Sequence, residues 1–85
     1  MKVIEAAQER VASREDLVSF LAELRRDLHE NRGAWENDNL DAYLEALQAV
    51  FTDWNGRFVN RGEPVPDTPT WKLIAEALLS AAVYE

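Results

Sequence analysis

The chain has 85 residues, of which 47% are hydrophobic, and a formal net charge of −7, because 16 Asp and Glu outnumber nine Lys and Arg. This length predicts a single domain over residues 1–85, and the apolar content is high enough to form a core. The charge argues against nucleic acid or an anionic membrane as a partner, since both are bound through Lys and Arg, and the lack of cysteine excludes disulfides and thiolate chemistry.

The N-terminal segment gives no sign of export. It carries Glu5 and Glu9 and lacks the apolar core of a secretory signal. No apolar stretch in the chain approaches the roughly 20 residues that are needed to cross a bilayer. We therefore expect a cytoplasmic protein.

Two helices are predicted in the first third of the chain. Residues 2–12 carry apolar side chains at helical spacing, namely Val3, Ile4, Ala7 and Val11. A short strand at Val3–Ile4 is the alternative. Ser13 then begins a capping box with Asp16, and a helical apolar stripe follows, consisting of Leu17, Val18, Phe20, Leu21, Leu24 and Leu28. This second helix is expected to end before Gly33.

A third helix is predicted from Asp38 or Asn39, either of which can cap it, to Asn55-Gly56. Its apolar stripe consists of Leu40, Tyr43, Leu44, Leu47, Val50, Phe51 and Trp54. A second, flat face on which another helix can pack closely is formed by Ala42, Ala46 and Ala49.

An extended loop is expected over about residues 56–68, because this segment contains Gly62, Pro64 and Pro66. Within it, Arg57–Val59 is compatible with a short strand. The last helix follows Thr68-Pro69-Thr70 and is apolar on nearly all sides, so we expect it at the centre of the bundle. The sequence therefore predicts an all-α, compact four-helix domain.

Negative charge is concentrated in residues 33–56, which hold five carboxylates, no Lys or Arg, and −5 of the net charge. Asp41 and Glu45 are four residues apart, so they share one solvent-facing side of the third helix. Their repulsion costs a few tenths of a kcal/mol, and acids in a first helical turn recover about as much from the helix dipole. Stability therefore neither requires nor forbids them, and a solvated face without function is the alternative to a binding site.

The three tryptophans fall into two groups. Trp54 and Trp71 lie on apolar stripes and are expected in the core. Trp35 lies in a polar segment, where it either folds over the core or stands exposed beside the acids as an aromatic anchor of the kind that interfaces favour.

The sequence gives little support for catalysis. The only histidine, His29, lies near the end of the second helix, where a cation interacts favourably with the helix dipole. Asp38, Asp41 and Glu45 are the best candidates for a hard-cation site, and a divalent-cation-dependent hydrolase is the alternative they permit. No histidine joins them, so we expect no catalytic residue, no metal and no cofactor, and we expect that the protein is not an enzyme.

Motifs spread over nearly the whole chain resemble a family of small bacterial domains of unknown function. They are Trp35-Glu36-Asn37, Leu40-x-x-Tyr43-Leu44-Glu45-Ala46, Gly62-Glu63-Pro64, Trp71 and Ala81-x-x-Tyr84-Glu85. The resemblance implies a single-domain bacterial protein. That family has no established activity, so the resemblance adds no catalytic residue.

A shorter stretch is similar to the barstar family of acidic ribonuclease inhibitors, over Ser13-x-x-Asp16-Leu17 and Asn39-Leu40-Asp41-Ala42. This similarity implies that Asp41 and Glu45 are ribonuclease-binding acids and that Trp35 is a contacting aromatic. The chain departs from that family further on, because barstar has a small parallel sheet and this chain ends in an apolar helical pattern.

These observations favour a protein-interaction module whose acidic third helix contacts a basic protein, as an inhibitor or immunity protein does. The predicted contact residues are Trp35, Glu36, Asp38, Asp41 and Glu45. A homo-oligomeric structural domain, joined through exposed apolar residues, is the second alternative beside the hydrolase.

Overall fold

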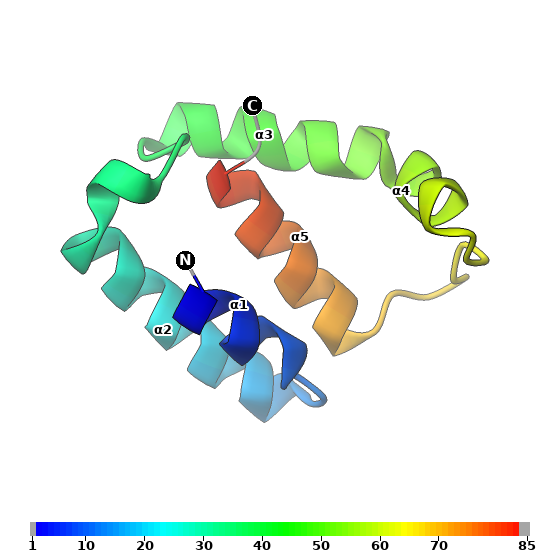
Figure 1. The fold of residues 1–85 in the computed structure, drawn as a ribbon, viewed down its shortest axis with the longest axis horizontal. Helices are drawn as coiled ribbons and strands as arrows, with labels where there is room; N and C mark the ends of the chain where they lie inside the picture. The colour runs from blue at the N-terminus through cyan, green and yellow to red at the C-terminus, as the bar shows by residue number, and fades with distance from the viewer. Residues whose placement is uncertain (1, 84–85) are drawn as a thin grey trace.

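The computed structural model describes residues 2–83, with side chains from residue 4 onward. Within this range the chain forms five α-helices and one short 3-10 helix (Figure 1), which are α1 Lys2–Glu9, α2 Arg14–Glu30, η1 Arg32–Ala34, α3 Leu40–Thr52, α4 Trp54–Arg61 and α5 Trp71–Val83. None of the described residues lies in a strand, which confirms the all-α prediction and excludes the strand alternatives at Val3–Ile4 and Arg57–Val59. Tyr84 and Glu85, which end one of the motifs, lie outside the described residues. Each described helix is too short or too polar to span a bilayer.

Helix α5 occupies the middle of the molecule, as its nearly all-round apolar sequence predicts. In Figure 1 it runs between α3 on one side and α1 with α2 on the other, and it contacts all three. Its buried side chains are Ala75, Ala77, Leu79, Ala81 and Ala82. Most of these are alanines, so neighbouring helices can approach α5 closely.

One side of α5 contributes to the main core. It joins apolar residues from the first half of the chain in a cluster that contains Ile4, Val11, Phe20, Leu24, Trp35, Ala75, Leu79 and Ala82. Phe20 is only 2% exposed, and removing apolar area from water contributes about 25 cal/mol for each Å². This cluster therefore holds α1 and α2 against α5.

Helix α3 packs on the other side of α5 through its alanine face. Ala46 and Val50 are buried, and the neighbouring Ala49 is partly buried. On α5, Ala77 and Ala81 are one turn apart and lie away from the main core. The contact between α3 and α5 is the most extensive between any two described helices. The predicted flat face is thus confirmed as a packing face.

The predicted capping residues define two of the helix starts. Ser13 Oγ accepts a hydrogen bond from the backbone N–H of Asp16 at 3.1 Å, and α2 begins directly after it. For α3 the cap is Asn39, whose Oδ1 accepts from the backbone N–H of Ala42 at 2.8 Å. Asp38, the other candidate, instead pairs with Arg32, with Oδ2 3.2 Å from Nε.

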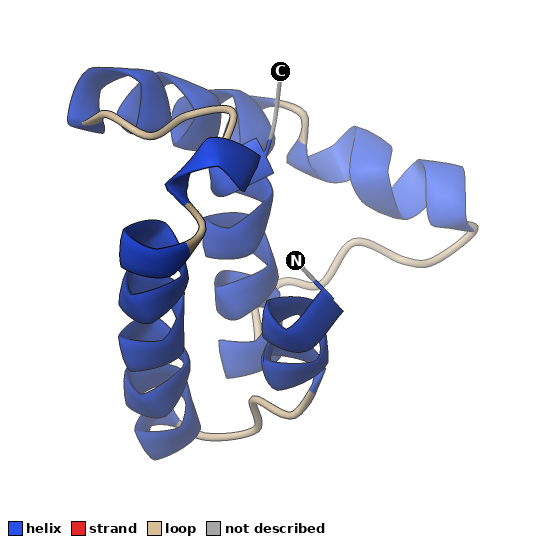
Figure 2. Cartoon of the chain, turned by 60° about the vertical axis from the view of Figure 1, so that its left-hand side comes forward, coloured by secondary structure: helices blue, strands red, loops and turns tan. Residues whose placement is uncertain are grey.

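The predicted loop over residues 56–68 is wrong in its first half, because residues 54–61 form α4. Figure 2 shows α4 on the far side of α5 from α2. Trp54 and Phe58, one turn apart, contact each other with ring centroids 5.2 Å apart, and Phe58 is buried. The helix ends at Gly62, whose φ of 71° lets the N–H of Glu63 reach the Phe58 carbonyl at 2.9 Å. The described part of the fold therefore has five helices where the sequence predicted four, and the loop is limited to residues 63–70.

The expected burial of Trp71 is also wrong. Trp71 is 41% exposed, because it is the first residue of α5 and precedes the part of that helix that lies between its neighbours. Trp54 is half-buried at the junction of α3 and α4, where it packs between Phe51 and Phe58.

Candidate functional site

The end of α2, η1 and the start of α3 meet at one corner of the molecule (Figure 1). Residues of these elements line an apolar groove, which we call the α2–α3 groove. Its volume is about 440 Å³. It is lined by Leu21, Leu24, Arg25, Leu28, Trp35, Asn37, Asp38, Asn39, Leu40 and Tyr43. Most of this lining is aliphatic or aromatic, which is the composition typical of binding sites.

The floor of the α2–α3 groove consists of two aromatic side chains whose polar atoms already have partners. Trp35 is 9% exposed, and its Nε1–H donates to Asp27 Oδ2 at 2.8 Å. The Tyr43 hydroxyl donates to the Leu78 carbonyl at 2.8 Å, and burial raises the pKa of this phenol. The floor therefore offers apolar surface and few free hydrogen-bonding groups.

The walls of the groove continue onto a row of exposed leucines. Leu40 is 74% exposed, Leu44 is 53% exposed, and Leu21 on the opposite wall is 38% exposed. At about 100° per residue, Leu40, Leu44 and Phe51 share one narrow stripe that points away from the alanine face of α3. We call these three residues the leucine stripe of α3. Contiguous exposed apolar surface edged by polar residues is typical of an interaction site.

The acids predicted on α3 lie along one edge of the leucine stripe. Asp41 and Glu45 are exposed, and they lie about 100° and 140° around the helix from Leu40. Neither carboxylate forms an ion pair or hydrogen bond within the part of the chain that the structure describes. These two residues are the acidic side of α3, and their charges are available to a partner.

The other three predicted contact residues have different surroundings. Glu36 is exposed in the segment before α3 and, like the acidic side, has no ion pair with a described residue. Asp38 is engaged with Arg32. Trp35 folds over the core, so it supports the groove from beneath and does not stand exposed as an anchor.

The carboxylates do not assemble into a metal site. No group of three or more His, Asp and Glu among the described residues is placed so that it could hold a metal ion. Asp38 precedes α3 and pairs with Arg32, while Asp41 and Glu45 lie on the helix surface, so the alternative of a three-carboxylate cation site has no geometric basis. His29 is exposed in the last turn of α2, where a cation complements the dipole.

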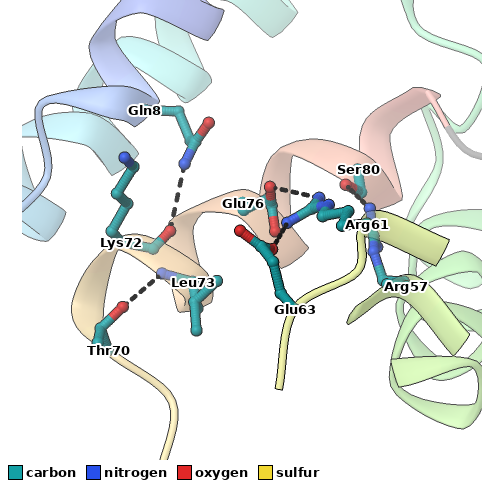
Figure 3. Close-up of polar contacts among 9 residues, drawn as sticks. All are labelled: Gln8, Arg57, Arg61, Glu63, Thr70, Lys72, Leu73, Glu76 and Ser80. Carbon is teal, nitrogen blue, oxygen red and sulfur yellow. Dashed lines mark hydrogen bonds and ion pairs between the residues drawn. The ribbon is translucent and has the colours of Figure 1, made fainter. Parts of the chain in front are cut away.

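A second, more polar cleft of about 480 Å³ lies between α1, α4 and α5, and three of its charged groups, Arg61, Glu63 and Glu76, are paired with one another (Figure 3). Arg61 of α4 donates to Glu76 Oε1 of α5 at 2.8 Å, and this hydrogen bond raises the pKa of Arg61. One turn earlier, Arg57 donates to Ser80 Oγ at 2.8 Å. These contacts fasten α4 to α5, so we assign this cleft a structural role.

The sequence reasoning missed the leucines of the groove, because it placed Leu21, Leu40 and Leu44 on stripes that were expected to be buried. The sequence does carry a signal for exposed leucines, because one helix has both a leucine stripe and an alanine face. A small domain has few helices with which to cover both faces. It also missed Arg57 and Arg61 of α4. These two arginines are four residues apart, as Trp54 and Phe58 are, and this spacing is typical of a helix.

The fold and the groove define a small all-α domain with an exposed apolar groove and with two exposed acids, Asp41 and Glu45, elsewhere on the surface of α3. Residues 13–85 match the model of the DUF7660 family, a family of unknown function, and the chain belongs to that family. No match to the chain was found among curated proteins or among solved structures. The expected domain of unknown function is thus found, whereas the similarity to barstar stays a prediction and the described residues contain no counterpart of its sheet.

The family match begins at Ser13, so α1 precedes it, but α1 is nevertheless integrated in the fold. Ile4 is 3% exposed, and Gln8 Nε2 donates to the Lys72 carbonyl of α5 at 3.3 Å (Figure 3).

Proposed function

We propose that this protein is a binding module without catalytic activity and that it holds a basic protein partner against the acidic side of α3. The observation that carries the proposal is that Asp41 and Glu45 are exposed and unpaired among the described residues, directly beside the exposed Leu40 and Leu44. Charges placed in this way steer a cationic partner and speed its association, while the leucines supply contact area.

The concrete form of the proposal is an inhibitor or immunity protein that covers a cationic site on a toxin or nuclease. Such a site is rich in Lys and Arg, so it complements a chain of net charge −7. A bacterial, cytoplasmic setting belongs to the same proposal, in keeping with the resemblance to small bacterial domains.

Self-association through the leucine stripe is a weaker candidate. Two copies would each bring a net charge of −7 to the contact, and like charges facing each other across an interface are unfavourable. We therefore treat a dimer as an outcome that would contradict the proposal.

The test is a binding measurement against the purified basic proteins that are encoded beside this gene. We expect the double variant Asp41→Asn/Glu45→Gln to lose at least about tenfold in affinity, and we expect the affinity of the unmodified protein to fall as salt rises. The matched control is Glu5→Gln/Glu9→Gln, which neutralises two exposed acids of the same spacing on α1.

Two outcomes would contradict the proposal. One is binding that does not depend on salt or that is weakened equally by both double variants. The other is light scattering in which the mean mass of the isolated protein rises with its concentration, because the leucine stripe would then be covered by a second copy.

A further inference from the structure

The uncharged polar side chains that line the α2–α3 groove are engaged within the protein. The side-chain donors of Trp35 and Tyr43 are used in the hydrogen bonds described above. Asn37 Nδ2 donates to a backbone carbonyl of α5 at 2.9 Å, and the side chain of Asn39 caps α3. The inside of the groove therefore offers apolar surface to a ligand.

Two charged side chains belong to the lining, and only one of them is free to meet a ligand. Asp38 pairs with Arg32, which compensates its charge. Arg25 is exposed and forms no ion pair or hydrogen bond with the described residues. Asp41 and Glu45 of α3 do not belong to the lining. The groove thus combines an apolar interior with one unpaired positive charge.

Arg25 belongs to the same wall of the groove as the leucines of α2. It follows Leu21 by four residues and precedes Leu28 by three, so the three side chains share one side of the helix. The aliphatic stem of an arginine can lie along such a wall while its guanidinium stays in water at the rim. A ligand with an apolar body and a negative group at one end would use both features.

The engaged lining also restricts the chemistry of that ligand. An extended peptide would bury N–H and C=O groups that the lining cannot satisfy, whereas an alkyl chain brings no such groups. A single guanidinium matches the single charge of a carboxylate, with which it forms two parallel hydrogen bonds. A phosphate monoester carries nearly two charges, so it would leave part of its charge without a partner.

The dimensions of the groove set the size of the apolar body. Its volume of about 440 Å³ falls in the range of small-molecule sites. From Leu21 to Leu28 the α2 wall rises about 10 Å, at 1.5 Å per residue. Carbon–carbon bonds of about 1.5 Å advance an extended chain by about 1.25 Å each, so a chain of about eight carbons covers this length.

We propose that the α2–α3 groove binds a medium-chain carboxylate. The alkyl chain lies over Trp35 and Tyr43, between Leu21 and Leu40, and the carboxylate pairs with Arg25 at the rim. This site goes beyond the proposed function and does not depend on it, because the ligand does not use the acidic side of α3.

The experiment is an NMR titration of the full chain with octanoate, followed through the backbone amides of the groove residues and the indole N–H of Trp35. Octan-1-ol and octylammonium carry the same alkyl chain with a neutral or a positive head group. Hexanoate keeps the carboxylate on a shorter chain. These ligands separate the contribution of the charge from that of the apolar body.

Two protein variants, each with a matched control, test the two features of the site. Arg25→Gln removes the charge, and its control is Arg10→Gln, at an exposed arginine that also lacks an ion pair among the described residues but does not line the groove. Leu40→Gln removes apolar lining, and its control is Val59→Gln, since Val59 is 69% exposed but lies on α4. The NMR spectrum of each free variant shows whether it is folded.

We expect octanoate to shift the signals of the groove residues with a dissociation constant of about 1 mM, as is usual for a ligand of about ten non-hydrogen atoms. Each buried methylene strengthens binding about twofold to fourfold, so hexanoate should bind at least about fourfold more weakly. Arg25→Gln should weaken octanoate about threefold to fivefold and leave octan-1-ol unchanged. Leu40→Gln should weaken both ligands at least about twofold, while the two control variants bind as the unmodified protein does.

Three results would overturn the inference. They are octylammonium binding as tightly as octanoate, equal effects of Arg25→Gln and Arg10→Gln, and no saturable shift of the groove signals at about ten times the expected dissociation constant. The double variant Asp41→Asn/Glu45→Gln separates this site from the proposed function, because it should weaken binding of a basic protein but not of octanoate. Loss of octanoate binding in that variant would also overturn the inference.

Discussion

The two faces of α3 contrast in an unusual way, because an alanine face packs inside while three large apolar residues, Leu40, Leu44 and Phe51, are exposed. Ala46 is 7% exposed in the contact with α5, whereas Leu40 and Leu44 are 74% and 53% exposed on the other face. Apolar character alone does not decide which face of a helix packs. The alanines of α3 meet a helix that is itself rich in alanine, so the two backbones can lie close together.

The inner face of α3 therefore serves the fold, and we propose that the outer face serves binding. The inner face attaches α3 to the central helix through the buried Ala46 and Val50 and the partly buried Ala42 and Ala49. The outer face leaves the leucine stripe exposed beside two unpaired carboxylates, a combination that a fold alone does not require.

The largest effect on the free energy of unfolding is expected at Trp35. This residue belongs to the main core, although it also forms the floor of the α2–α3 groove. Trp35→Ala should lower the free energy of unfolding by about 3–5 kcal/mol, because it opens a large cavity and removes the hydrogen bond to Asp27. Trp71→Ala is the control, and this half-exposed residue should cost much less in the same urea titration. Equal losses at the two positions would place Trp35 outside the core.

The next effect tests the close approach of α3 and α5. Ala77→Leu should lower the free energy of unfolding by about 1–3 kcal/mol, because the added atoms have no space in a fully buried position. Ala22→Leu makes the same change at an exposed position of α2 and should stay within about 0.5 kcal/mol. If Ala77→Leu were tolerated equally well, the contact would not depend on small residues.

A smaller effect is expected where α3 is tied to α5 by a hydrogen bond. Tyr43→Phe removes the donor to the Leu78 carbonyl and should cost about 1 kcal/mol at neutral pH. Burial raises the pKa of Tyr43, so its native state favours the neutral phenol. The associated stability is present below the unfolded pKa of about 10 and is lost as pH rises through the higher folded pKa.

Urea titrations above about pH 10 should therefore show a smaller difference between the unmodified protein and Tyr43→Phe than titrations at neutral pH. Tyr84 is present in both proteins and does not affect the comparison. A difference that stayed constant over this range would contradict the burial of the phenol.

The smallest effect is expected at the acidic side of α3. Asp41→Asn/Glu45→Gln should change the free energy of unfolding by no more than about 0.5 kcal/mol, because relief of repulsion and loss of the dipole interaction nearly offset each other. Thermal melts at low and high salt would measure it. A larger loss would show that these acids serve the fold.

Much of the fold could be predicted because local chemistry determines it. The hydroxyl of Ser13 and the amide of Asn39 mark helix starts wherever they can accept from the backbone two or three residues on. The central position of the last helix followed from its lack of a polar face. Both features depend on residues that are neighbours in sequence.

The groove could not be predicted in the same way, since it depends on which face of α3 packs. A helical wheel shows a leucine face and an alanine face with equal clarity, and the choice is made by the alanines of α5, such as Ala77, more than 25 residues later in the chain. The sequence did identify Asp41 and Glu45 as the acids without a structural partner. It missed α4, because Asn55-Gly56 indicated the end of the third helix and the start of a loop. The third helix instead ends at Thr52, and α4 continues past Gly56 to the left-handed Gly62.

The central claim is that the exposed leucines of α3 are dispensable for folding, and the free energy of unfolding of Leu40→Gln/Leu44→Gln tests it most directly. Glutamine keeps the helix propensity close to that of leucine, so the comparison isolates the apolar surface. The account predicts a urea-unfolding free energy within about 0.5 kcal/mol of the unmodified protein. A loss of about 2 kcal/mol or more, which is the range for buried leucines, would show that these side chains hold the fold together and would contradict the account.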